Sequence, residues 1–478
     1  MDQGLLARKS VEDVIRSSET GERRLERTLG VFSITAIGIG AIIGAGIFVL
    51  TGTAAARYAG PAIMLSFVMG GIVCALVGLC YAELASMMPV SGSTYTYTYA
   101  TLGELVAWMI GWDLVLEYGM GAATVAVGWS SYAVSILHSL GIDLPPALIA
   151  GPGGSPSGIV NLPAVVIVAL LTTLLVLGTQ NSSRLNNIMV AVKLVVVVAF
   201  IAVGAFFVSP GHWHPFIPDN AGEFGHFGLS GVLRGSAVVF FAYIGFDAVS
   251  TAAQEARNPQ RDMSRGILGS LVICTLLYIA VAAVLTGIVP YDQLNVADPI
   301  AKAVDAIGLA WFAVLVKIGA LAGLTTVILV LLFGQSRIFF TMAEDGLLPS
   351  LFALVHPRLQ TPYRSQILIG AVVAAVAALV PVEVLGEMVS IGTLFAFTLV
   401  CGAVIYLRRS DTSAKRPFRV PGVPLVPVLG ILCSVALMAG LPLTTWLRLL
   451  VWMAVGLAVY FLYGRRHSVL RHGRIAAR

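Results

Sequence analysis

Long uninterrupted runs of apolar residues dominate the pattern along this chain. A helix that crosses a bilayer needs ~17 to 25 predominantly apolar residues. Twelve runs meet this requirement, and they cover residues 31–56, 61–88, 104–137, 162–178, 185–208, 229–252, 266–289, 309–336, 365–381, 388–407, 424–440 and 445–463. The connections between them are mostly short and polar or rich in Pro and Gly. The pattern therefore predicts an all-α integral membrane protein with twelve transmembrane helices.

Two of these runs contain residues that weaken a helix. Residues 38–48 read GIGAIIGAGIF, and residues 240–250 read FFAYIGFDAVS. Each interior Gly costs a helix about 0.5 to 1 kcal/mol relative to Ala, and a backbone group freed in hydrocarbon must find another partner. The runs are therefore either sites of close helix packing, as in Gly40-x-x-x-Gly44, or breaks that open around a polar ligand. Interrupted spans in corresponding positions of two halves favour a secondary transporter with its site near the midplane.

Composition and the placement of basic residues agree with a membrane protein and add an orientation. Hydrophobic residues make up 58% of the 478 positions and charged residues 11%, against roughly 45 to 50% and 25% in soluble globular domains. If the N-terminus is cytoplasmic, 23 of the 29 Lys and Arg residues fall on the cytoplasmic side, as the positive-inside rule requires. We therefore expect a multi-pass protein of the cell membrane with both termini in the cytoplasm.

Other classes of function find little support in the residue types. The seven His residues fall in or near loops and tails, and the five Cys residues lie inside apolar runs. No zinc-protease or nucleophile-elbow motif occurs, and a Gly-rich nucleotide loop would need a preceding strand. We therefore expect neither an enzyme nor a metal site, and no nucleic-acid partner.

Charged side chains inside the apolar runs are few, and such residues are functional candidates by default. Asp113 and Glu117 lie four residues apart, and therefore on one face of a helix, where they either act in function or pair helices. Lys193 lies deep in its run and is the candidate for binding and releasing a coupling proton. Asp247 either receives that charge or caps a reopened helix. Lys317, near the end of its run, is interpreted as a member of a structural ion pair.

The two glycine-containing runs define a binding chemistry if they open. An opening near residues 42–46 would expose backbone N–H groups and the positive end of the second half-helix, which suit a carboxylate. An opening near residues 241–245 would expose carbonyl oxygens that accept hydrogen bonds from an α-ammonium group. The zwitterionic α-amino acid is the substrate class that satisfies both ends.

Long motifs along the chain add a resemblance to this reasoning. They are GIGAIIGAGIF from Gly38, CYAELASMMPVSGSTYTYTY from Cys80, GWDLVLEYG from Gly111, FFAYIGFDAVSTAAQEARNPQRDMSRGI from Phe240 and GQSRIFFTMAEDGLLP from Gly334. At these residues the chain resembles the amino acid–polyamine–organocation (APC) transporter superfamily, and within it bacterial members of the cationic amino acid transporter family. The resemblance covers nearly the whole chain.

The resemblance implies a fold and a mechanism. Residues 31–208 and 228–409 would form two five-helix inverted repeats of a LeuT-like core with broken helices 1 and 6, residues 420–464 two extra helices, and residues 1–30 and 465–478 cytoplasmic tails. It implies alternating access by a permease coupled to protons, which are the only cofactor expected. Lys193 matches a lysine that replaces a sodium ion in proton-coupled relatives, and Asp247 is the second proton-coupling candidate. The expected partners are the amino acid and the lipid bilayer, with the protein a monomer.

The resemblance also implies a set of substrate-binding residues. Gly44, Ala45 and Gly46 would meet the substrate carboxylate, and Ile42, Phe241, Ala242 and Ile244 would hold the amino group. Beyond them a substrate side chain would meet apolar Leu331, with Glu117 nearby. Because a bulky Leu shortens the pocket, alanine is as good a candidate as arginine. An amino acid exchanger, a non-transporting sensor of the same fold and a channel stay open as alternatives.

Overall fold

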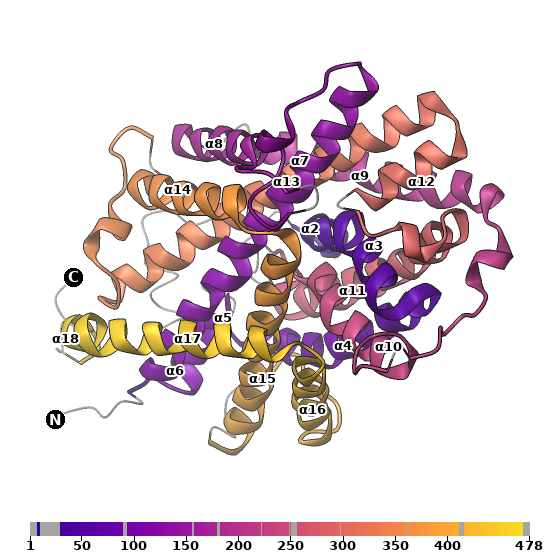
Figure 1. Ribbon diagram of the computed structural model, residues 1–478. Helices are drawn as coiled ribbons and strands as arrows, with labels where there is room; N and C mark the ends of the chain where they lie inside the picture. Colours follow the sequence, from indigo (N-terminus) through magenta and orange to yellow (C-terminus); the bar gives the residue numbers. More distant parts are fainter. Residues whose placement is uncertain are drawn as a thin grey trace.

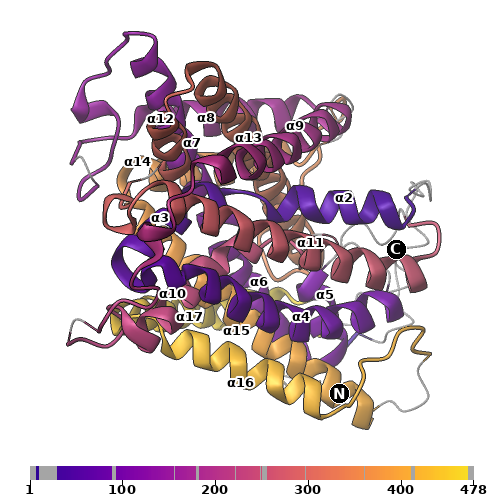
Figure 2. The same cartoon turned by 90° about the vertical axis from the view of Figure 1, so that its right-hand side faces the viewer.

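The protein folds into a bundle of helices, seen in Figure 1 and, turned by a right angle, in Figure 2. This computed structural model describes residues 7–9, 29–88, 93–154, 157–178, 182–220, 222–247, 249, 256–296, 298–359, 361–410 and 415–471. Besides helices, turns and loops, these residues contain two isolated β-bridges. The all-α prediction is confirmed for this part of the chain, while most of the expected N-terminal tail lies outside it.

The helices follow the apolar runs of the sequence. The longer ones are α2 (Val31–Ile42), α4 (Ile63–Met87), α6 (Glu104–Leu114), α7 (Gly121–Ser139), α8 (Leu162–Leu177), α9 (Ser182–Gly204), α10 (Gly228–Val239), α11 (Pro259–Ile288), α13 (Ala310–Glu344), α14 (Tyr363–Leu379), α15 (Val382–Ser410), α16 (Leu425–Ala439) and α17 (Leu443–Val459). The short ones are α3 (Thr51–Ala54), α5 (Ser93–Thr101), α12 (Pro299–Ile307) and α18 (Arg465–His467). Short π-helical segments continue several of them, at Gly46–Leu50, Ala55–Ala59, Val115–Met120 and Tyr460–Gly464.

Length and hydropathy identify the helices that suit a bilayer. Seven helical stretches among the described residues are long and apolar enough to cross a membrane, and five shorter apolar helices accompany them. Their outward faces carry large apolar side chains, such as Val195, Leu276 and Leu450, each at least 60% exposed. Such exposure would be unfavourable in water and is expected where lipid is the solvent. The protein is therefore an integral membrane protein.

Two long helices, α11 and α13, each form the centre of a group of packed helices. The helices α2 and α4 pack along α11, whereas α7 and α9 pack along α13. At one end of the bundle, the short helix α12 lies beside α3 and α13 (Figure 2). This arrangement brings the glycine-containing runs of α2 and α10 into the middle of the molecule.

A stack of three Trp side chains fastens the last long helix to the bundle. The rings of Trp108 and Trp112 lie 5.9 Å apart at an interplanar angle of 21°, and those of Trp112 and Trp452 lie 4.8 Å apart at 23°. The indole N–H of Trp112 donates to the carbonyl of Trp452 at 2.9 Å, and the indole N–H of Trp452 donates to the carbonyl of Trp112 at 3.2 Å. The helix α17 is thus bound to α6 by both stacking and hydrogen bonds.

Candidate functional site

The first glycine-rich run breaks the helix where the sequence predicts an opening. The helix α2 ends at Ile42, Ile43 has extended backbone angles (φ −71°, ψ 105°), and helical structure resumes at Gly46. The next half-helix begins with the amide of Phe48 donating to the carbonyl of Gly44 at 3.2 Å. The amides that precede Phe48 therefore begin a new helix and have no carbonyl one turn before them to bond.

The second run breaks in the same manner. The helix α10 ends at Val239, a 3₁₀ turn covers Phe240–Tyr243, and Ile244 is extended (φ −62°, ψ 138°). Gly245 follows with φ +109°, a backbone conformation that residues with a side chain rarely adopt. The glycine is therefore required by the geometry of this break.

The two breaks contact one another through their glycines. A Cβ atom at Gly46 would lie 2.1 Å from the Cα of Ala242, and one at Gly245 would lie 2.7 Å from the carbonyl oxygen of Ala41. Close packing and helix opening, alternatives at the level of sequence, thus occur together. The three atoms nearest to a Cβ at Gly44 all belong to the side chain of Val327, the closest at 3.1 Å.

Lys193 holds the carbonyl groups that the first break frees. Its side chain on α9 is fully buried, and its ammonium donates to the carbonyls of Gly40 and Ile43, the latter at 2.9 Å. A third bond, of 3.4 Å, goes to the hydroxyl of Thr326 on α13. These three acceptors are uncharged. Lys193 therefore connects the broken helix to α13 by hydrogen bonds to neutral groups.

Tyr278 joins the two breaks, and sequence reasoning did not identify it. Its hydroxyl lies 2.8 Å from the carbonyl of Ile42 and 2.8 Å from the carbonyl of Ala242, one oxygen from each break. A hydroxyl has one proton, so it donates to the two carbonyls in turn. The signal was present in the sequence, because a buried Tyr in an apolar helix needs a partner for its hydroxyl.

The candidate carboxyl groups lie near the second break, whereas Lys193 bonds the first. Asp113, Glu117 and Asp247 are all buried, with at most 2% of each residue exposed. The hydroxyl of Tyr118 donates to Asp247 at 2.8 Å, and the carboxyl groups of Glu117 and Asp247 interact. The structure thus places Asp247 with Tyr118 and Glu117, while the hydrogen bonds of Lys193 go elsewhere.

The segment that carries Asp113 and Glu117 differs from the expected regular helix. The α-helix α6 ends at Leu114, and the π-helical segment Val115–Met120 carries Glu117. Four residues still make close to one turn there, so the two side chains stay on about the same side of the helix. Asp113 and Glu117 are close enough to interact electrostatically.

The remaining predicted site residues are buried at or near the breaks. At most 7% of each is exposed, and they are Ile42, Ala45, Phe241, Ala242, Ile244 and Leu331. Leu331 on α13 faces the start of α7, where a Cβ at Gly121 would lie 3.3 Å from its Cδ1. Since Gly121 is four residues after Glu117, Leu331 lies on the same side of the site as that carboxyl group.

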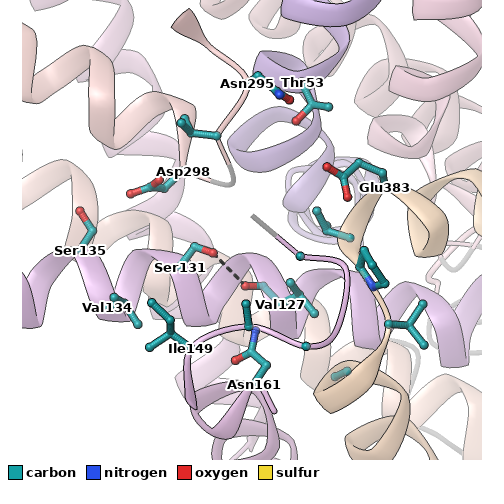
Figure 3. A pocket seen from close by; sticks show the side chains of 18 of the residues that line it. Thr53, Val127, Ser131, Val134, Ser135, Ile149, Asn161, Asn295, Asp298 and Glu383 are labelled. Atoms are coloured by element: carbon teal, nitrogen blue, oxygen red, sulfur yellow. Dashed lines mark hydrogen bonds between the residues drawn. The ribbon is translucent and has the colours of Figure 1, made fainter. Parts of the chain in front are cut away.

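A separate cavity of about 620 Å³ lies at the end of the bundle that carries α12. Arg57 on its wall donates to the side chain of Asn295 at 3.0 Å and lies 3.4 Å from Glu383. Asp298 and Glu383 stand on opposite sides of the hollow in Figure 3. Burial raises the pKa of Asp298 to about 6. None of the predicted site residues lines this cavity.

Broken helices that meet inside an apolar bundle define a class of integral membrane transport protein. Comparison with known proteins places the chain within that class. Residues 29–466 match the model of the amino acid permease family. The chain therefore belongs to the amino acid permeases of the APC superfamily, which confirms the resemblance, and it is not an enzyme.

Several transport proteins are similar to this chain over nearly its whole length. The chain is similar to the branched-chain amino acid permease BcaP of Bacillus subtilis (strain 168), with 48% identity over 98% of this chain and 100% of the relative. It is equally similar to the methylthioribose transporter of the same organism, with 47% identity over 98% and 99%. The vacuolar cationic amino acid transporter 4 of Arabidopsis thaliana is 33% identical over 98% and 96%.

Proposed function

We propose that this protein is a secondary active permease that carries an L-amino acid across the cell membrane by alternating access, driven by protons. Two breaks that meet through Gly46 and Gly245 carry the proposal, because they place backbone amides and carbonyls together in an apolar interior. We further propose twelve spans, two five-helix inverted repeats and cytoplasmic termini. The position of each break on the first long helix of its half supports the repeat.

The substrate carboxylate would bind the amides of Gly44, Ala45 and Gly46, at the positive end of the second half-helix. The ammonium would bind carbonyl oxygens at the second break, beside Phe241 and Ala242. Tyr278 would hold the two halves of this site in register, because its hydroxyl bonds a carbonyl from each.

We propose a neutral substrate with an apolar side chain, from alanine to the branched-chain amino acids. Buried Leu331 closes the route between α13 and α7, which leaves little room for a long cationic side chain. Two relatives at 48% and 34% identity are branched-chain amino acid permeases. Arginine would instead need Glu117 to be reachable past Leu331.

Lys193 would carry the coupling proton. As an ammonium it bonds the first break and Thr326 at once, which stabilises the arrangement that receives substrate. As a neutral amine it is a weaker donor, so α2 and α13 would separate more easily and release the substrate. Asp247 and Glu117 would be the alternative proton site.

Uptake by purified protein in proteoliposomes tests the proposal. Radiolabelled leucine and alanine should accumulate when the outside is acidic, and unlabelled methylthioribose and arginine should compete poorly. The methylthioribose arm is needed because that relative is as similar as the amino acid permease. Competition by methylthioribose with none by any amino acid would overturn the substrate assignment.

Three further outcomes would correct the mechanism. Exchange of labelled for unlabelled amino acid, with no accumulation in a pH gradient, would identify an exchanger. Amino acid binding without any movement into the liposomes would identify a sensor of the same fold. Uptake that neither saturates nor shows counterflow would identify a channel.

A further inference from the structure

A groove of about 300 Å³ opens at the end of the bundle where α11 begins, far from the helix breaks. It lies between the first turns of α11 and the linker that precedes α16. Its walls are Arg261, Ser264, Arg265, Leu268, Pro417 and Phe418. In Figure 2 the start of α11 lies at the end of the bundle away from α12. We call this feature the arginine groove.

The linker wall of the arginine groove is held in place by a buried acid. Glu83 on α4 is 1% exposed and forms a bidentate pair with Arg408, at 2.9 and 2.7 Å. The same carboxylate accepts a bond from the amide of Val420 at 2.7 Å, and Ser86 accepts one from the amide of Phe418 at 3.3 Å. Pro417 and Phe418 are thus fixed against α11, and the groove is preformed.

Two arginine side chains give the arginine groove a positive charge. Arg261 and Arg265 lie four residues apart on exposed positions of α11, so their guanidinium groups stand side by side. Neither has an ion pair or a side-chain hydrogen bond in the part of the chain that the structure describes. Exposed Arg257 and Arg419 add to the positive potential. An anion is therefore the ligand that this surface favours.

The groove changes from polar to apolar along α11. Leu268 follows Arg265 by three residues and lies one turn further into an apolar helix that is long enough to cross a membrane. Pro417 and Phe418 face it from the linker. A small soluble anion would use the guanidinium groups alone, whereas an amphiphile would use both halves of the groove.

We propose that the arginine groove binds an anionic phospholipid. The guanidinium groups of Arg261 and Arg265 hold the phosphate oxygens, to which their planar forks are well suited. The glycerol backbone and the first part of the acyl chains lie against Leu268, Pro417 and Phe418. Basic grooves between helices at the membrane surface recognise lipid headgroups by this chemistry.

Lipid binding to the purified full-length protein in neutral detergent tests the proposal. Native mass spectrometry and thermal unfolding are measured with phosphatidylglycerol, with phosphatidylcholine, and with inorganic phosphate at equal concentration. Phosphatidylglycerol should stay bound and raise the unfolding midpoint, and the other two should not. The double variant Arg261→Gln/Arg265→Gln should bind phosphatidylglycerol about 10- to 30-fold more weakly, since each basic residue contributes about one factor of five.

A matched control separates the groove from net charge. Arg358→Gln/Arg364→Gln removes the same charge at exposed positions of the loop after α13 and the start of α14, and it should keep wild-type binding. If the Gln double variant does not fold, Arg261→Lys/Arg265→Lys keeps the charge and should still weaken binding by losing the planar forks. Equal losses in both Gln pairs, or stabilisation by inorganic phosphate alone, would overturn the proposal.

Discussion

Two buried lysines occupy opposite environments in this protein. Lys193 on α9 donates to backbone carbonyls and a hydroxyl, all uncharged. Lys317 on α13 is also buried, at 3% exposure, but its ammonium lies 2.8 Å from the carboxylate of Asp305 and 3.4 Å from the hydroxyl of Ser139. The same residue type in the same kind of helix therefore has two different sets of acceptors.

The difference shows how acceptors decide what a buried ammonium can do. Carbonyl oxygens stabilise the ammonium through hydrogen bonds, but they carry no full charge to oppose the departure of a proton. A carboxylate carries a full charge, so it attracts the ammonium as an ion pair as well as through a hydrogen bond. The pair at Lys317 confirms the structural ion pair that the sequence suggested, whereas a switching role for Lys193 remains a proposal.

The largest effect that separates the two lysines should come from Lys193→Met. It removes three hydrogen bonds from a charged donor, each contributing ~1.5 to 3 kcal/mol. Uptake driven by an acidic exterior should fall at least about tenfold, since ~1.4 kcal/mol is a factor of ten. Proteoliposome uptake is the measurement, and Lys317→Met is the matched control that should keep its pH response. Undiminished accumulation by Lys193→Met would show that Lys193 does not carry the coupling proton, and Asp247 or Glu117 would then be the candidate.

A smaller loss should follow from Tyr278→Phe, which keeps the ring and removes the hydroxyl between the two breaks. Each neutral hydrogen bond contributes about 0.5 to 1.5 kcal/mol, so substrate affinity should fall roughly three- to tenfold. The dependence of uptake on the pH gradient should remain, because Lys193 is unchanged. Competition binding measures the affinity, and a variant with wild-type affinity would show that the breaks keep their register without this bond.

The two partners of the Lys317–Asp305 ion pair should differ in how much their substitution lowers the free energy of unfolding. Asp305→Asn leaves a buried ammonium without its counter-charge and should lower the free energy of unfolding by about 1 to 2 kcal/mol, since water reaches the half-exposed pair. Lys317→Met removes the buried charge itself and should cost about 0.5 kcal/mol or less. The double variant should recover most of the loss. Thermal unfolding tests this order, and equal losses in the two single variants would contradict it.

The smallest effect concerns Asp298, which lies near Lys317 on the wall of the 620 Å³ cavity. Burial raises its pKa to about 6, from ~3.9 in an unfolded chain. Between these pH values the folded protein binds more protons than the unfolded chain. The free energy of unfolding therefore falls as the pH rises from ~4 through about 6. The stability of Asp298→Asn relative to the wild type should therefore be greater at pH 7.5 than at pH 5, and unfolding scans at the two pH values measure this difference. A constant difference would contradict the shift.

The sequence predicts the two breaks well, because the cause is local. Glycines in an apolar run weaken a helix wherever they occur, and α2 and α10 end at Ile42 and Val239 as expected. The contact between Gly46 and Ala242 was not predictable in the same manner. It joins residues almost 200 positions apart, and only the packing of the whole bundle determines such a pair.

Other features of the site depend on departures from regular geometry. Glu117 lies on the π-helical segment Val115–Met120, whereas a residue pattern with period four reads as an ordinary helix. Tyr278 was missed for a related reason. Its hydroxyl connects the two breaks only because each break frees a carbonyl group beside it. The depth of Lys193, by contrast, follows from counting residues along an apolar run.

The stack of Trp108, Trp112 and Trp452 gives this protein an intrinsic optical reporter. Indoles within 4.8 and 5.9 Å of one another couple electronically, so their near-ultraviolet circular dichroism depends on the distance between α6 and α17. Three of the seven Trp residues contribute to that signal. Any movement of the last helix away from the bundle during the transport cycle would change the spectrum, without a label and without a mutation.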